Sequence, residues 1–123
     1  KNGVNFINDS KSTNLESVNK ASLKVNNCML ILHGLAKGIS PNKLILSDEI
    51  RKILVPQNSD FDVSMFKSIV IKYESIEDLK QLIKENYQDF NTVLFSCGGS
   101  SFNDFSNYID RGNYFKKMIV GEI

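Results

Sequence analysis

Three polar stretches follow short apolar runs, and their residue types suit the binding of an anion. Asp9, Lys11 and Thr13 follow the first run, and Lys37 lies in a stretch bounded by two glycines. Residues 96–101, with the sequence SCGGSS, are the densest run of serine and glycine in the chain. Hydroxyl groups, glycine-flanked amides and two ammonium groups suit carboxylates or phosphates, which need several donors and positive charge.

Ordinary turn chemistry is an alternative explanation for each of these stretches. Asn, Ser and Gly cap helices and permit tight turns, so they are common between strands and helices. A binding site is favoured by the fact that all three stretches follow predicted strands, because ligands of open α/β sheets bind beyond the carboxyl ends of the strands. From the residue types alone, an anion site and simple turns both remain open.

The sequence gives little support for a nucleotide-binding motif, a metal site or a catalytic nucleophile. No G-x-x-x-x-G-K-[ST] pattern occurs, and no G-x-G-x-x-G follows the first apolar run. His33 is the only histidine and the chain has no Cys-x-x-Cys pair, which argues against a zinc site. Cys97 follows a predicted strand, as a nucleophile could, but no base for it can be identified. Cys28 is expected in the core.

The elements that position these stretches alternate between strand and helix. Helices are predicted over residues 15–25 and 75–86, where apolar residues recur at three- to four-residue spacing and Ser75 is a suitable N-cap. Strands are predicted where short runs are apolar and β-branched, over residues 4–7, 28–32, 52–55, 68–72 and 92–95.

Further helices are predicted with weaker patterns. Two short ones fall at residues 41–48 and 60–66, and a final helical region runs from Phe102 to Met118 with an interruption near Arg111 and Gly112. Strands that alternate with helices imply an α/β fold with right-handed crossovers. We therefore predict a Rossmann-like three-layer domain with a mostly parallel sheet of five or six strands.

Length and composition restrict the class of protein. The chain has 123 residues, which corresponds to one domain, and 41% of them are hydrophobic and 24% charged. The formal net charge of +1 argues against partners such as nucleic acid or an anionic membrane surface. Two cysteines cannot form a disulfide framework, so we expect a reducing, cytoplasmic location. No apolar run approaches the ~20 residues of a membrane-spanning helix.

Two distant motifs are specific enough to suggest a family. Residues 8–14, NDSKSTN, resemble the N-D-S-K-A-T-N string that opens the C-terminal domain of a Mur ligase. Residues 96–108, SCGGSSFNDFSNY, are similar to S-P-x-x-A-S-x-D-x-F-x-N-[FY] of the same family, and residues 111–115 match its R-G-x-x-F. Residues 34–38, GLAKG, lie where the family has a glycine-rich loop with a lysine. The resemblance covers the whole chain, most weakly over residues 40–72, and the first motif points to the branch that adds D-glutamate.

The resemblance implies an ATP-dependent amide ligase of bacterial peptidoglycan synthesis. ATP would phosphorylate the carboxylate of UDP-N-acetylmuramoyl-L-alanine, and the amine of D-glutamate would attack the resulting acyl phosphate. Residues 1–123 would be the C-terminal domain that delivers the amino acid, excised from a three-domain enzyme. The main sites for ATP and Mg²⁺ would lie in the preceding domains, so the chain by itself is expected to be inactive and to hold no catalytic residue and no metal.

The resemblance also implies roles for individual residues, carried over by position. Five of them would bind D-glutamate, namely Thr13, Lys37, Ser101, Phe102 and Tyr108, with Phe102 acting mainly through its backbone amide. Asp9 would contact the nucleotide, and Lys11 the region of the phosphates and the acyl intermediate. The sequence departs from the family's pattern at several positions, with His33 and Pro56 in place of glycines, Cys97 in place of a proline and Asn103 in place of an acidic residue. These changes leave the proposed ligand positions intact but alter the loop over residues 33–38.

Two other functions remain open from the sequence. One is another amide ligase of this superfamily, such as a folylpolyglutamate synthase or a sister Mur ligase. The other is a free-standing, non-enzymatic α/β module that binds a ligand. In all cases we expect a monomer with small-molecule partners and no nucleic-acid or membrane partner.

Overall fold

The computed structural model describes residues 3–9, 15–33, 46–57, 69–98 and 107–121. Its centre is a five-stranded sheet in the order β1-β5-β2-β3-β4, and every neighbouring pair is parallel. The strands are β1 (Asn5–Asp9), β2 (Cys28–His33), β3 (Ile50–Pro56), β4 (Ile69–Tyr73) and β5 (Thr92–Gly98). The all-parallel sheet confirms the predicted α/β fold class.

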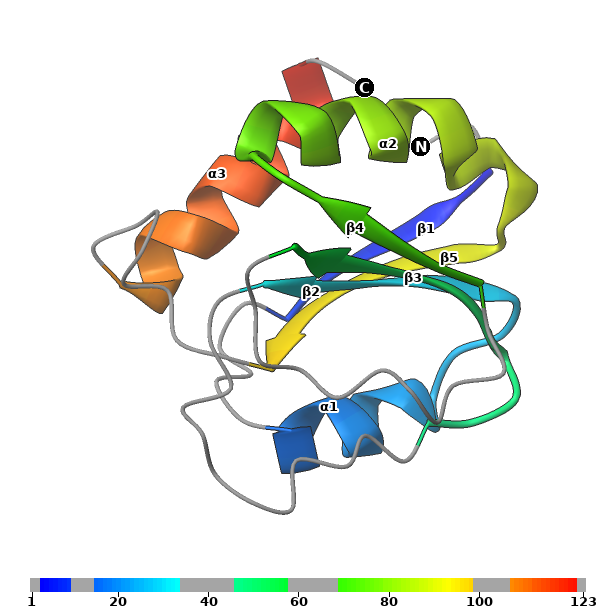
Figure 1. The fold of residues 1–123 in the computed structure, drawn as a ribbon. Helices are drawn as coiled ribbons and strands as arrows, with labels where there is room; N and C mark the ends of the chain where they lie inside the picture. The colour runs from blue at the N-terminus through cyan, green and yellow to red at the C-terminus, as the bar shows by residue number, and fades with distance from the viewer. Residues whose placement is uncertain (1–2, 10–14, 34–45, 58–68, 99–106, 122–123) are drawn as a thin grey trace.

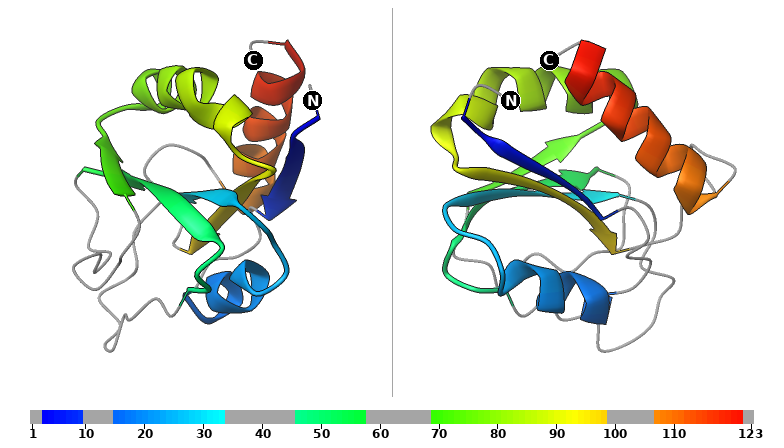
Figure 2. Two further views of the ribbon diagram at one scale, coloured as in Figure 1. Left: turned by 90° about the vertical axis from the view of Figure 1, so that its right-hand side faces the viewer. Right: turned by 180° about the vertical axis from the view of Figure 1, so that it is seen from behind.

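Helices cover both faces of the sheet and make three layers (Figure 1). Helix α1 (Leu15–Ser22) lies on one face, and α2 (Ile76–Asn86) and α3 (Tyr108–Gly121) lie on the other, as the reverse view also shows (Figure 2). A short 3₁₀ turn, η1 (Tyr87–Asp89), follows α2. The chain moves in opposite directions across the sheet from β1 to β2 and from β4 to β5, so right-handed crossovers place α1 and α2 on opposite faces.

The core consists of two apolar clusters, one on each face of the sheet. All six residues of β2 are buried, and the first five alternate between the clusters. Met29 and Ile31 pack with residues of α2 and α3, whereas Cys28, Leu30 and Leu32 pack with Val18 of α1. This confirms the prediction that the continuous apolar run at residues 28–32 is a parallel strand covered on both sides.

Most predicted elements are present, with shifted ends. All five strands occur where they were predicted, and α1 ends at Ser22, before the predicted end at residue 25. The predicted cap of α2 is confirmed, because the Ser75 hydroxyl accepts a hydrogen bond from the backbone N–H of Asp78 at 3.1 Å. The predicted helix at 60–66 lies outside the described residues, as does most of the one at 41–48, whose described residues 46–48 are not helical.

The predicted interruption near Arg111 and Gly112 is wrong. Helix α3 runs without a break from Tyr108 to Gly121. A glycine lowers helix propensity by only about 1 kcal/mol, which tertiary packing can outweigh. Here both residues are buried, and the next turn places Phe115 in the core, so packing against the sheet keeps this segment helical.

Candidate functional site

The three polar stretches singled out in the sequence begin at neighbouring strand ends. Strands β1 and β2 flank β5, and they run parallel to it. Asp9, the last residue of β1, pairs with Ser96, and His33, the last residue of β2, pairs with Gly98. The segments that follow Asp9, His33 and Gly98 therefore leave the same edge of the sheet. We call the ends of these three strands the carboxyl edge.

Most of the residues predicted to bind ligand lie outside the part of the chain that the structure describes. These are Lys11, Thr13, Lys37, Ser101 and Phe102. Asp9 is described, and its half-buried side chain stands at the carboxyl edge itself. Tyr108 is the first residue of α3, and only its backbone is described. The structure thus brings together the points from which the predicted site residues depart, while their ligand roles stay predictions.

The strand pairing is irregular at the carboxyl edge. Between β2 and β5 the register passes from Ile31–Phe95 to His33–Gly98, which leaves one extra residue on β5. Between β1 and β5 the pairing stays regular up to Asp9 and Ser96. An extra residue bends a strand and redirects the chain beyond it, and such bulges are common beside functional sites. The extra residue of β5 therefore lies directly at the carboxyl edge.

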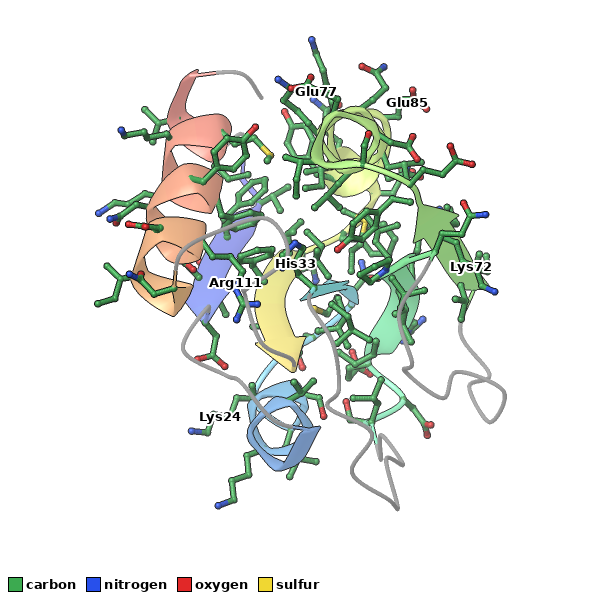
Figure 3. The ribbon with its side chains drawn as sticks, turned by 60° about the vertical axis from the view of Figure 1, so that its left-hand side comes forward. Lys24, His33, Lys72, Glu77, Glu85 and Arg111 are labelled. Atoms are coloured by element: carbon green, nitrogen blue, oxygen red, sulfur yellow. The ribbon has the colours of Figure 1, made fainter. Side chains whose placement is uncertain are left out.

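A buried polar contact joins the carboxyl end of β2 to α3. His33 and Arg111 are 1% and 0% exposed, and an Arg111 guanidinium nitrogen, Nη1, lies 3.3 Å from His33 Nδ1 (Figure 3). Because arginine can only donate hydrogen bonds, His33 Nδ1 must be the acceptor in this contact. The imidazole is then neutral, with its proton on Nε2.

Two further hydrogen bonds hold the ends of β1 and β2. The Asn8 side chain, next to Asp9, donates through Nδ2 to the backbone carbonyl of Gly112 in α3 at 2.9 Å. The Tyr73 hydroxyl, at the end of β4, donates to the carbonyl of Leu32 at 2.5 Å. Leu32 lies at the irregular point of the β2–β5 register, where a side-chain donor can satisfy a carbonyl that ladder pairing would otherwise bind.

Sequence reasoning did not find the contact between His33 and Arg111. The sequence patterns predict His33 in the loop after the strand and Arg111 at a helix interruption. One signal could have identified Arg111 as an inward-facing residue, because Arg111, Phe115 and Met118 have the i, i+4, i+7 spacing of one helix face. The structure buries all three.

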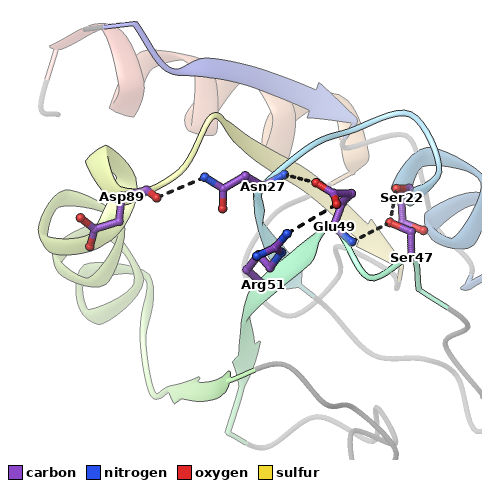
Figure 4. A network of polar contacts seen from close by, with 6 residues as sticks. All are labelled: Ser22, Asn27, Ser47, Glu49, Arg51 and Asp89. Carbon is purple, nitrogen blue, oxygen red and sulfur yellow. Dashed lines mark hydrogen bonds and ion pairs between the residues drawn. The ribbon is translucent and has the colours of Figure 1, made fainter.

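The opposite, amino edge of the sheet is closed by a separate polar network (Figure 4). The backbone N–H of Asn27 donates to a carboxylate oxygen of Glu49 at 3.0 Å, and the other oxygen lies 3.5 Å from a guanidinium nitrogen of Arg51. The Ser47 hydroxyl donates to the carbonyl of Ser22 at 3.1 Å. Asn27 itself has a φ of 42°, in the left-handed region. These contacts join the turns that precede β2 and β3.

Cys28 has no features of a nucleophile. It is fully buried in the first position of β2, and desolvation by burial raises its pKa to about 12, despite an opposing backbone hydrogen bond to Leu94. A thiol in this state stays protonated and inert at neutral pH. The prediction that Cys28 is a core residue is confirmed. The side chain of Cys97 lies outside the described part of the structure.

Within the described ranges, no three His, Cys, Asp or Glu side chains come together in a way that could hold a metal ion. Asp9 is the one carboxylate that ends a strand of the carboxyl edge among these residues. Among the same residues, no helix is long and apolar enough to cross a membrane.

Comparison with known proteins gives a consistent set of relatives. A scan against protein-family models finds no match. The chain is 31% identical to the UDP-N-acetylmuramoylalanine–D-glutamate ligase of Protochlamydia amoebophila, over 97% of this chain and 28% of the relative. It is 35% identical to the ligase of that name from Pelodictyon phaeoclathratiforme, over 96% and 27%, and 37% identical to that of Buchnera aphidicola, over 95% and 28%.

The chain thus spans less than a third of the length of the curated relatives it matches. The match extends through nearly all of its own residues, including both of the motifs and the strands that end at the carboxyl edge. Over nearly its whole length, the chain is therefore a homologue of one part of the UDP-N-acetylmuramoylalanine–D-glutamate ligases, in agreement with the resemblance of its motifs to Mur ligases.

Proposed function

We propose that this chain is the C-terminal domain of an ATP-dependent ligase that joins D-glutamate to UDP-N-acetylmuramoyl-L-alanine in peptidoglycan synthesis. The observation that carries the proposal is the similarity to D-glutamate ligases over 95–97% of the chain. The geometry of the sheet supports it, because the segments with the anion-binding residue types all leave the carboxyl edge. A cytoplasmic location and a monomeric state are parts of the same proposal.

In this proposal the carboxyl edge binds the incoming amino acid. D-glutamate carries two carboxylates, which need cations and hydrogen-bond donors. Lys37 supplies the charge, and Thr13, Ser101 and Tyr108 supply hydroxyl groups, with the backbone amide of Phe102 as a further donor. These groups hold the carboxylates and orient the amine toward the acyl phosphate. Such orientation accelerates a reaction between two substrates by removing the entropic cost of bringing them together.

Asp9 and Lys11 have different roles in the proposal. Asp9 is the last residue of β1, and Lys11 belongs to the segment that follows it. Asp9 contacts the nucleotide, and the Lys11 ammonium group neutralises charge on the phosphates and on the acyl intermediate. ATP and Mg²⁺ supply the phosphoryl chemistry, and we assign their main binding sites to parts of the ligase outside these 123 residues.

Substitution of Lys37 in the full-length protein tests the proposed site. Loss of a charge-assisted hydrogen bond should raise the KM for D-glutamate by about 10- to 100-fold for Lys37→Ala. The KM for ATP should change by less than about threefold, because ATP is bound mainly elsewhere. Steady-state assay of ligation with each substrate varied in turn gives both values.

The matched control is Lys72→Ala, which removes an exposed lysine from the edge strand β4, far across the sheet from β1. It should leave both KM values unchanged. An unchanged KM for D-glutamate in Lys37→Ala would remove Lys37 from the site. Ligation by the 123-residue chain alone, or a full-length protein that does not use D-glutamate, would contradict the proposed function.

A further inference from the structure

We propose that His33 is a positioning residue for the D-glutamate site, acting through Arg111. Its Nδ1 atom accepts a hydrogen bond from the Arg111 guanidinium and thereby fixes the first turns of α3 against the carboxyl end of β2. This inference rests on the proposed function and deepens it, since it assigns a role to a residue that contacts no substrate. His33 also stands where the resembling family has a glycine.

The first support is the burial of the pair. Arg111 is completely buried and His33 nearly so, and the two are 78 positions apart in the sequence. A buried guanidinium is very costly unless its donors find acceptors. A neutral imidazole that accepts at Nδ1 meets this need without adding a second charge. The contact is therefore a specific link between β2 and α3, and not a chance approach of two surface side chains.

The second support is the position of the pair relative to the proposed ligand residues. His33 is four residues before Lys37, and Arg111 lies three residues after Tyr108, so it is on the same face of α3 one turn later. The link thus connects the strand that leads to Lys37 with the helix that begins at Tyr108. Figure 3 shows both side chains between α3 and the sheet.

The third support is that the same turn of α3 is also bound to β1. Asn8 donates to the carbonyl of Gly112, the residue after Arg111, and Asn8 directly precedes Asp9. Two adjacent residues of α3 therefore hold the ends of two strands from which ligand-binding segments depart. A site works only when its donors are placed within a fraction of an ångström, so the supports beneath it affect binding. Loss of the His33 acceptor should loosen this arrangement.

Two substitutions at the same position separate the hydrogen bond from the bulk of the side chain. In the full-length protein, His33→Leu keeps a side chain of similar size but removes the acceptor. His33→Asn keeps an acceptor, because its Oδ1 can occupy the place of Nδ1. His33→Leu should raise the KM for D-glutamate about tenfold, while His33→Asn should stay within about threefold of the wild type. The KM for ATP should change less than about twofold in both.

The comparison of the two substrates distinguishes positioning from a general loss of structure. Thermal unfolding of each variant shows whether it is folded at the assay temperature. If His33→Leu does not fold, Arg111→Met takes its place, since it removes the donor and keeps a long side chain. The same selective increase in the KM for D-glutamate is expected from it.

Several results would overturn the inference. These are an unchanged KM for D-glutamate in the variant that lacks the hydrogen bond, an equal rise in His33→Leu and His33→Asn, or an equal rise for ATP and D-glutamate. If the wild-type protein ligates D-glutamate and any of these results is found, only the role of His33 is wrong. If the wild-type protein does not use D-glutamate, the proposed function is wrong, and so is the role of His33.

Discussion

The two edges of the sheet are held together in different ways. At the amino edge, short turns bind one another largely through backbone groups. The carbonyl of Asn27 accepts from the backbone N–H groups of Asn91 and Thr92 at 3.0 and 3.5 Å, and the Asn27 N–H donates to Glu49. At the carboxyl edge, buried side chains reach across the fold, as Arg111 does to His33 and Tyr73 does to Leu32.

Because of this difference, we expect substitutions at the two edges to have different effects on stability and on substrate binding. Turns at the amino edge satisfy their own backbone groups, and changes there should affect only the free energy of unfolding. At the carboxyl edge the polar groups are buried at the strand ends from which the segments with the proposed ligand residues depart, an arrangement that is costly to build. Ligand sites of open α/β sheets lie at this edge, so its side chains should affect both stability and substrate binding.

The largest expected effect concerns the apolar packing of α3 against β5. Phe115, one turn after Arg111, stacks on Phe95 of β5 with ring centroids 3.9 Å apart and planes at 6°. Phe115→Ala leaves a cavity and should lower the free energy of unfolding by about 3–5 kcal/mol, measured by urea denaturation. Phe115→Leu is the control and should lose less than about 1.5 kcal/mol. A loss of less than about 1 kcal/mol in Phe115→Ala would show that this contact does not anchor α3.

A smaller effect is expected from the network at the amino edge. Glu49→Ala leaves the half-buried N–H of Asn27 without its acceptor and should lower the free energy of unfolding by about 1–2 kcal/mol. Arg51→Ala removes only an ion pair whose side chains are 56% and 41% exposed, and should cost less than about 0.5 kcal/mol. Neither should change the KM for D-glutamate in the full-length protein. A change in that KM would contradict the expected difference between the two edges.

The smallest expected effect tests whether the site extends beyond the carboxyl edge to the end of β4. Ser75 follows β4, the strand farthest from β1, and caps α2 by accepting from the N–H of Asp78. Ser75→Ala should cost about 1 kcal/mol of stability, and Ser75→Asp should restore most of it, because Asp is an equally good N-cap. Both variants should bind D-glutamate as the wild type does. Weaker binding by Ser75→Ala would extend the site to β4.

The fold could be predicted from the sequence where local signals were strong. The apolar run of β2 and the capped, amphipathic pattern of α2 identify these elements without tertiary information, because burial and helix periodicity leave clear patterns. The break predicted at Arg111 and Gly112 failed for the opposite reason. Glycine and a charged residue are locally unfavourable in a buried helix, and only the packing of α3 on β1 and β5 overrides that preference.

The candidate site was predictable only in part. Its polar stretches and its resemblance to Mur ligases are present in the sequence, and the relatives agree with that resemblance. The residues beneath it were not found, since His33 and Arg111 are 78 positions apart and neither belongs to a recognisable motif for such a contact. A contact between such distant residues depends on strand order, which local patterns do not specify.

The sequence by itself determined the α/β class, the strands that carry the polar stretches and the family that the motifs resemble, because these follow from local periodicity and from residue types at fixed spacing. Only the tertiary structure decided that β5 inserts between β1 and β2, so that three distant segments begin at one edge. It also decided that Arg111 is buried against His33, because a charged side chain enters the core only where folding has placed an acceptor for it.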